Sequence, residues 1–421
     1  MSRLIGSLTV GVALLGSIPA ARQAPSVGPA EVKLGVKGHA NATPWIAAKG
    51  NFVAVAWGAT APDDGTDIYV AVSRDAGRSF GAPLRVNQQP GTARVGGELP
   101  PRVALGPSAT TGDPPMTVVW GAKLPRTAIL AAHSGDGGRT FERHQILSSE
   151  TAEGDRGWHA LALSSGGAPH VMWLDHRGLA ARPKSTHDHH GDGADIAQFS
   201  GLYHYSMTRS SRDREVAKGV CYCCKLAMAA GRGNELFVAW RHVYPGNIRD
   251  IAFAMSSDDG RTFSAPLRIG EDNWQLAGCP DDGPAMAVGT DGTIHIVWPT
   301  VIGGESPRGS LFHASSRDGR SFTARRQIPT RGGPRPMHPQ VIVDSGGRLL
   351  VAWDEVIDGA RQASARSLGL DSAGNISAGP LIDLGDAPSA YPVLAMSGRG
   401  PIAVWTQGAG DVSEIVVRAL R

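Results

Sequence analysis

The sequence predicts an all-β fold, a seven-bladed β-propeller of four-stranded blades. Tryptophan ends a short apolar run seven times, at spacings of 52 to 67 residues: Trp57, Trp120, Trp173, Trp240, Trp298, Trp353 and Trp405. Further apolar runs of four to six residues flank each tryptophan between Gly, Asp and Ser turns, and this is strand length. A unit of about 50 residues that holds four strands is typical of a propeller blade.

The strands of each unit are placed relative to its tryptophan. First strands are expected at residues 44–48, 102–105, 159–163, 225–228, 285–288, 340–343 and 392–395. Third strands are expected at residues 68–72, 128–132, 202–207, 251–255, 311–314, 362–366 and 414–418. The seven tryptophans fit the packing between sheets better than a ligand platform, because a large ring recurs at the same place in every blade.

The seventh unit ends at Arg421 without a fourth strand. Residues 31–35 precede the first unit and read like the fourth strand at residues 83–86. A strand that the N-terminus adds to the last sheet closes the ring and removes its exposed edges. We therefore expect the last blade to be completed by residues 31–35.

The first 21 residues have the layout of a secretory signal peptide, with an apolar run over residues 4–18 and small residues before Ala21. We expect a linker over residues 22–30 and one propeller domain over residues 31–421, with an inserted loop at 175–201. No later segment reaches the roughly 18 unbroken apolar residues of a membrane helix. The sequence thus predicts a periplasmic or secreted monomer without a membrane span.

The charge pattern excludes one class of partner. The formal net charge is +3, from 41 Lys and Arg residues against 38 Asp and Glu residues, with both signs interspersed. A nucleic-acid-binding domain needs a basic patch or stripe, and the sequence has none.

The turn between the third and fourth strands repeats a polar motif with a closing phenylalanine. Good copies stand at residues 73–80, 134–141 and 256–263, and a fourth at residues 315–322 has Arg317 where aspartate is expected. The motif resembles the Asp-box, or BNR repeat, of the sialidase-like superfamily. Physically it is a turn in which Asp accepts backbone N–H groups and Gly takes a positive φ, so we expect it to be scaffold at the end away from the site.

The resemblance to exo-alpha-sialidases implies a glycosidase site at the opposite end, and a glycan or small-molecule substrate. In this interpretation Tyr391 is the nucleophile, and Asp63 or Asp64 is the acid/base. Arg241 and Arg361 are carried over as arginines that clamp the substrate carboxylate. The neighbouring loops contribute further substrate-binding candidates, which are Asp175, Arg177, Asp354 and Glu355.

The sequence departs from the sialidase pattern in two places. Residues 43–46 read Thr-Pro-Trp-Ile where an Arg-Ile-Pro motif is expected. Cys223-Cys224-Lys225 stands where the fourth blade is expected to supply a glutamate. A tyrosine with a pKa near 10 is a poor nucleophile at neutral pH without such a partner.

Four cysteines occupy the entries to the fourth and fifth blades: Cys221, Cys223, Cys224 and Cys279. In an oxidising compartment they predict a disulfide between the two loops, with a second bridge as an option. A soft-metal site, for example for copper, is the alternative, with thiolates joined by His159, His242 or His338. A catalytic thiol is a third hypothesis, although the sequence shows no base next to the cysteines.

Two function classes remain open at this point. One is a glycan-directed enzyme that uses Tyr391 and the carboxylates of the site loops. The other is a non-catalytic periplasmic module that binds a metal or a partner through the Cys/His face. The histidine-rich tract at residues 187–190 suits either a mobile loop or metal binding.

Overall fold

The computed structural model describes residues 30–63, 65–108, 112–181, 193–210, 212–303, 307–371 and 374–420. The predicted signal peptide at residues 1–21, residues 22–29 of the linker and the histidine-rich tract lie outside this part of the chain. None of the described helices is long and apolar enough to cross a membrane.

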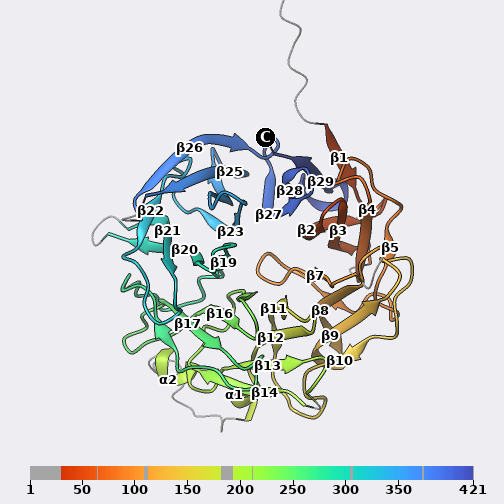
Figure 1. The fold of residues 1–421 in the computed structure, drawn as a ribbon. Coiled ribbons are helices and arrows are strands. Elements are labelled where there is room, and N and C mark those ends of the chain that lie inside the picture. Colours follow the sequence, from red (N-terminus) through yellow and green to blue (C-terminus); the bar gives the residue numbers. More distant parts are fainter. Residues whose placement is uncertain are drawn as a thin grey trace, which may run out of the picture.

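Seven antiparallel sheets stand around a central axis, so the predicted seven-bladed β-propeller is confirmed (Figure 1). Blade 1 is β2 (Ala40–Lys49), β3 (Phe52–Thr60), β4 (Thr66–Ser73) and β5 (Leu84–Arg85). Blade 2 is β7 (Arg102–Leu105), β8 (Met116–Leu124), β9 (Arg126–Ser134) and β10 (Gln145–Ile146), with a short extra strand, β6 (Ala93–Arg94), on β8. Blade 3 is β11 (Arg156–Leu163), β12 (Pro169–Asp175), β13 (Gly201–Ser206) and β14 (Arg214–Lys218). Blade 4 is β15 (Ala227–Ala230), β16 (Leu236–Arg241), β17 (Ile251–Ser256) and β18 (Leu267–Arg268).

The remaining blades follow the same order. Blade 5 is β19 (Ala285–Val288), β20 (Ile294–Ile302), β21 (Arg308–Ser316) and β22 (Arg326–Ile328). Blade 6 is β23 (Met337–Val343), β24 (Leu349–Ile357), β25 (Ala360–Leu370) and β26 (Ile376–Asp383). Blade 7 is β27 (Ser389–Ser397), β28 (Gly400–Gln407), β29 (Glu414–Ala419) and β1 (Glu31–Leu34).

The N-terminal strand closes the ring as predicted. β1 pairs with β29 in antiparallel register, with Val32 opposite Val417 and Leu34 opposite Ile415. Figure 1 shows the two strands side by side where the ends of the propeller meet. Blade 7 thereby has the same four-stranded order as the other blades, with β1 as its outer strand.

Among the described residues, seven hydrophobic clusters lie one at each blade-to-blade interface, and an eighth surrounds the cysteines. The seven tryptophans are fully buried in these clusters, which confirms their role in packing between sheets. Removal of one large buried ring from such an interface costs roughly 3–5 kcal/mol.

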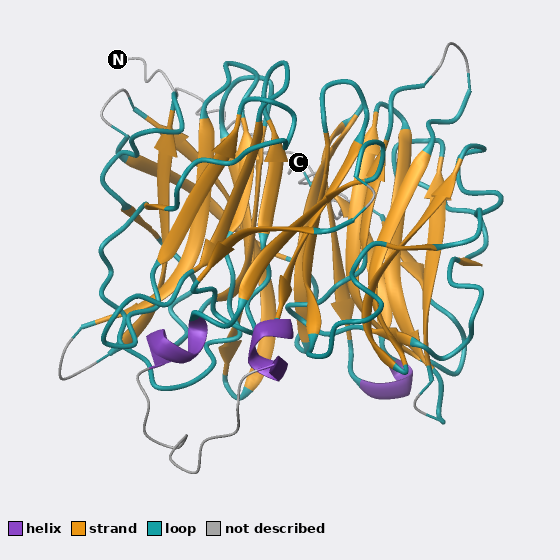
Figure 2. Cartoon of the chain, turned by 90° about the horizontal axis from the view of Figure 1, so that it is seen from below, coloured by secondary structure: helices purple, strands orange, loops and turns teal. Residues whose placement is uncertain are grey.

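The two ends of the ring differ. The loop predicted to be inserted at residues 175–201 carries α1 (Arg177–Ala181) and α2 (Gly193–Ala197), and a short 3-10 helix (Gly410–Val412) lies in the equivalent connection of blade 7. Figure 2 shows all three helices at one end. The four turns with the repeated aspartate motif, at residues 73–80, 134–141, 256–263 and 315–322, are called the Asp-motif turns. They connect third to fourth strands and therefore lie at the other end.

Four of these turns share one hydrogen-bond pattern. In the first, Asp75 accepts the backbone N–H groups of Arg78 and Ser79 at 3.0 and 2.9 Å, and Ser73 Oγ donates to Asp75 at 2.7 Å. The fourth copy differs from its predicted alignment. Ser316 and Asp318 take the places of Ser73 and Asp75, so the turn keeps its aspartate and is one residue shorter.

Two histidine pairs lie buried between second and third strands. His170 Nδ1 is 3.1 Å from His204 Nε2 in blade 3, and His295 Nδ1 is 3.1 Å from His313 Nε2 in blade 5. Burial lowers the pKa of His204 and His313 to about 3 and that of His295 to about 4. These rings are therefore neutral in the folded protein at pH values where the unfolded chain is already protonated.

We expect stability to fall as the pH drops below about 6.5, because the unfolded state then binds protons that the folded state does not. One histidine with a folded pKa near 3 contributes a loss of about 2 kcal/mol at pH 5. Urea unfolding at pH 7.5 and pH 5 measures the loss, and His204→Gln should reduce it. His39→Gln, in a partly exposed loop, is the control. An equal loss in wild type and His204→Gln would contradict the prediction.

Candidate functional site

Four inner strands carry a bulge at the same end of the ring. The register shifts by one residue in β2, β11, β23 and β27, and one bulged residue in each has a left-handed backbone: Thr43 (φ 54°), Trp158 (φ 54°), His338 (φ 51°) and Tyr391 (φ 54°). Such a conformation is costly for a residue with a side chain, and bulges of this kind re-aim side chains next to binding sites. His338 and Tyr391 meet edge to face, with ring centroids 4.7 Å apart.

A loop between blades 1 and 2 crosses the channel at this end. Figure 1 shows the chain before β7 extending toward the middle of the ring. Gly97 of this loop packs tightly against blades 6 and 7, across the channel. A Cβ atom at this position would lie 2.4 Å from the Tyr391 ring and 3.2 Å from His338 Nε2. Glycine at this position thus lets the loop reach blades 6 and 7. We call this region, where loop 95–101 meets blades 4 to 7, the channel mouth.

Glu98 is the centre of the channel mouth. Its Oε2 accepts the backbone N–H groups of Lys225 at 2.8 Å and Gly283 at 2.6 Å, and its Oε1 accepts from Lys225 Nζ at 3.2 Å. Both side chains of the ion pair are almost fully buried. Burial alone raises the pKa of Glu98, but the charges of Lys225 and His338 outweigh it and lower the pKa.

Asp354 organises the other half of the channel mouth. It accepts from His338 Nδ1 at 3.0 Å and from the Tyr391 backbone N–H at 2.7 Å, and it also accepts from Arg361. Burial opposes protonation of His338, yet the charges of Asp354 and Glu98 raise its pKa. The fully buried Asp354 carboxylate is therefore a positioning group that holds one imidazole ring and one arginine.

The groups that solvent reaches here are few. Tyr391 is half-buried, Asp281 is exposed, and the side chains of Arg361 and Arg335 are 29% and 39% exposed. Burial, then Asp354, Asp281 and Glu98, raises the pKa of Tyr391 in spite of Arg361. Burial and the Glu98 charge raise the pKa of Asp281. The four groups are close enough for their charges to act on one another, since Asp281 and Arg361 affect Tyr391 and Arg335 affects Asp281.

Asp282, next in the chain, is buried, and neither of its carboxylate oxygens has a hydrogen-bond partner among the described residues. Its closest cation is Arg335, at 3.7 Å. Burial and the Glu98 charge raise the pKa of Asp282 to about 7.

The structure gives several predicted site residues a different role. Position two after the blade tryptophan repeatedly accepts the indole N–H: Asp175 from Trp173 at 3.1 Å, Glu355 from Trp353 at 2.9 Å and His242 from Trp240 at 3.4 Å. Burying a tryptophan requires a partner for its N–H. The polar residues that cluster in these loops are therefore largely indole partners.

The remaining predicted residues are distributed as follows. Arg241 is buried and donates to the backbone carbonyls of Asp282, Arg249 and Pro299 at 2.6–2.9 Å. Arg177 is tied to Asp175 and Asp213 and stacks on Tyr203, away from the channel mouth. Asp63 is exposed and accepts the Gly65 N–H at 3.2 Å, and no described contact joins it to Tyr391. Asp64 lies outside the described residues.

Sequence reasoning missed Glu98, Lys225 and Arg335. One signal was present for the first: residues 86–101 form a long connection without strand periodicity, and such connections are often functional. The partners of Glu98 come from blades far apart in the sequence, so no local pattern identifies them.

The cysteines divide into a disulfide and two thiols. Cys223 is bonded to Cys279, which confirms the predicted bridge between the blade 4 and blade 5 loops. Cys221 and Cys224 are buried thiols 3.8 Å apart. Within the described part of the chain, His159, His242 and His338 do not join the sulfur cluster. His159, for example, lies within 3.2 Å of the Val119 carbonyl oxygen instead.

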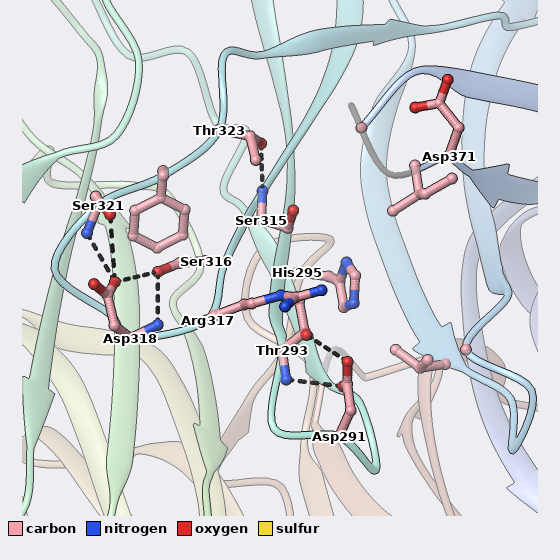
Figure 3. A pocket seen from close by; sticks show the side chains of 15 residues that line it. Asp291, Thr293, His295, Ser315, Ser316, Arg317, Asp318, Ser321, Thr323 and Asp371 are labelled. Atoms are coloured by element: carbon pink, nitrogen blue, oxygen red, sulfur yellow. Dashed lines mark hydrogen bonds between the residues drawn. The ribbon is translucent and has the colours of Figure 1, made fainter.

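Wider clefts lie away from the channel mouth. Figure 3 shows a cleft of about 660 Å³ at the Asp-motif end, between blades 5 and 6. Its polar groups are mostly paired with each other, for example Asp291 with Thr293 at 2.7 Å and Asp318 with Ser316 at 3.1 Å. The channel itself keeps a space of about 60 Å³ beneath the channel mouth, lined in part by Arg102, Trp45 and Lys225.

Comparisons place the fold among known propellers. No protein-family model matches the chain, and no curated protein matches it. The GH93 alpha-L-arabinofuranosidase of Fusarium graminearum, solved with arabinobiose, is similar with a TM-score of 0.53 and 14% identity over 94% of this chain and 97% of that one. A PL25 ulvan lyase bound to -[GlcA(1-4)Rha3S]- has a TM-score of 0.57 and 9% identity over 91% and 95%. At these identities the likeness concerns the fold.

We predict that Glu98→Ala destabilises the protein strongly, by roughly 3–5 kcal/mol, because it leaves a buried lysine charge without a partner. Combining it with Lys225→Met should recover part of the loss. Urea unfolding of the single and double variants measures both effects. Glu153→Gln, which removes an exposed ion pair with Arg126, should leave the midpoint unchanged. Additive losses in the double variant would show that the pair does not hold the loop in place.

Proposed function

We propose that the protein is an exported enzyme that cleaves an acidic glycan at the channel mouth. The single observation that carries this proposal is the grouping of the solvent-reachable side chains Tyr391, Asp281, Arg361 and Arg335 at the channel mouth. It combines two groups able to move a proton with two fixed positive charges. Cleavage of a glycosidic bond beside an acidic group needs these functions together.

Arg361 and Arg335 are proposed to bind the acidic group of the substrate. Arg361 uses one nitrogen for Asp354, which fixes the guanidinium and leaves its other nitrogens for a carboxylate or sulfate. Arg335 contacts the Pro280 carbonyl and lies beside Asp282. An arginine held by a buried carboxylate loses little freedom when it binds an anion, so recognition is pre-organised.

Tyr391 and Asp281 are proposed to handle the protons. The raised pKa of Tyr391 keeps the hydroxyl protonated near neutral pH, so we assign it as donor to the leaving oxygen and not as the nucleophile. Asp281 then takes the proton from the attacking water. His338 and Asp354 act through Tyr391, because they hold its ring and its backbone N–H.

The comparisons support a glycan as the substrate class. The similar folds include an arabinofuranosidase with arabinobiose and a lyase with a glucuronate-containing ligand. The four Asp-motif turns support the resemblance to the sialidase-like propellers. Sialic acid is one acidic sugar among several that the two arginines suit. The Cys223–Cys279 disulfide supports export to a periplasmic or extracellular space.

The proposal is tested by incubating the purified chain with sialosides, uronate-containing and sulfated oligosaccharides, and arabino-oligosaccharides. New reducing ends without ultraviolet absorbance indicate hydrolysis. An absorbing unsaturated product indicates elimination and would replace the hydrolytic step. Turnover of a neutral substrate with none on any acidic one would refute the arginine assignment.

Variants locate the reaction. Tyr391→Phe and Asp281→Asn should each lower kcat by about 100-fold or more with a small change in KM. Arg361→Gln should mainly raise KM. Tyr69→Phe, on the stacked ring of blade 1, and Asp411→Asn, in the exposed 3-10 helix of blade 7, are the matched controls. Full activity of Tyr391→Phe, or no turnover on the whole panel, would overturn the proposal.

A further inference from the structure

The two free thiols form a buried all-sulfur cluster beside the channel mouth. Cys221 Sγ and Cys224 Sγ are 3.8 Å apart, and Cys224 Sγ is 3.9 Å from Cys223 Sγ. The ligand atoms of these three residues all lie within 4.8 Å of one another. Ala194 and Ala197 of α2 and Val243 pack around them, so the cluster is shielded from water.

These distances match those of a metal–thiolate site. With metal–sulfur bonds of about 2.3 Å, sulfurs on a tetrahedral or trigonal centre lie about 3.8–4.0 Å apart. Two unpaired thiols within a Cys-x-x-Cys segment can therefore bind one ion without a backbone movement. The neighbouring disulfide sulfur of Cys223 adds a third soft, neutral contact.

The donors around the sulfurs favour an anionic thiolate. Arg249 Nη1 donates to Cys221 Sγ at 3.2 Å, and the Asp282 backbone N–H donates to Cys224 Sγ at 3.3 Å. Arg249 is itself buried and stacks near Tyr222. Hydrogen bonds of this kind to ligating sulfurs orient them and tune the ion that they hold.

The charge balance selects the kind of ion. Two thiolates with one monovalent ion carry a charge of minus one, which the buried Arg249 guanidinium neutralises. A divalent ion in the same place would leave a buried net positive charge, and this is costly. Thiolates without imidazole or carboxylate ligands also select soft ions. Cu(I) satisfies both conditions.

We propose that Cys221 and Cys224 bind one Cu(I) ion per chain, with the Cys223–Cys279 disulfide intact beside it. The histidines take no part, since His242 accepts the Trp240 indole N–H and His338 is bound to Asp354. This binding is independent of glycan cleavage. A failure of one proposal therefore leaves the other standing.

The test begins with anaerobically purified protein, in which mass spectrometry should find the Cys223–Cys279 bridge and thiol counting should find two free thiols. Cu(I) is then titrated in competition with bathocuproine disulfonate. We expect one Cu(I) retained per chain, with X-ray absorption showing sulfur ligands alone. A native Cys221–Cys224 disulfide, or no copper retained against the competitor, would overturn the proposal.

Matched variants separate binding from folding. Cys221→Ser and Cys224→Ser should each abolish the retained copper. The double variant Cys223→Ser/Cys279→Ser keeps the thiol pair and should still retain one ion. Arg249→Gln should weaken affinity by roughly 10- to 100-fold, and Zn(II) should compete poorly. Far-ultraviolet circular dichroism verifies that each variant is folded. Copper retained equally by Cys221→Ser and wild type would refute the assignment.

Discussion

The buried ion pair between Glu98 and Lys225 is the contact on which the candidate site depends. A propeller leaves an opening on its axis, between the inner strands of its seven blades. Loop 95–101 crosses this opening, and Glu98 accepts three hydrogen bonds from residues of blades 4 and 5. Because the loop also packs on Tyr391 through Gly97, one carboxylate connects the two sides of the channel mouth. The solvent-reachable groups are then fixed relative to one another by buried charges.

The repeated sequence unit made the fold predictable. The same repeat also placed polar residues at regular positions, and these were mistaken for site residues. Seven tryptophans at blade spacing, with strand-length runs around them, identified the ring and the N-terminal closing strand. Each buried indole also requires an acceptor, and the chain supplies it two residues later as Asp175, His242 or Glu355. In the sequence, these polar residues looked like site candidates because they cluster in the loops after the tryptophans. Their regular position instead reflects the need of each buried indole for a hydrogen-bond acceptor.

Two residues that the sequence analysis named as site candidates, Tyr391 and His338, lie at the channel mouth and share a different feature. Tyr391 and His338 precede prolines and have left-handed backbones at bulges, as does Thr43 in blade 1. Each stands directly before a proline at the entry to an inner strand, and this X-Pro pair is visible in the sequence. Glu98 had no such signal, because its partners are 127 and 185 residues away in the chain. Glu98 meets these partners only because the closed ring brings loop 95–101 next to blades 4 and 5.

Two short segments, residues 221–225 and 279–283, connect the cysteines to the channel mouth. Cys224 precedes Lys225, the partner of Glu98, and accepts the N–H of Asp282, which precedes Gly283, the other partner of Glu98. The Cys223–Cys279 disulfide spans the same two segments. The sulfur cluster therefore forms the wall behind the ion pair. A metal held by Cys221 and Cys224 would stiffen this wall without touching the groups proposed to bind the glycan, because Tyr391 and Arg361 belong to blades 7 and 6 on the other side of Glu98.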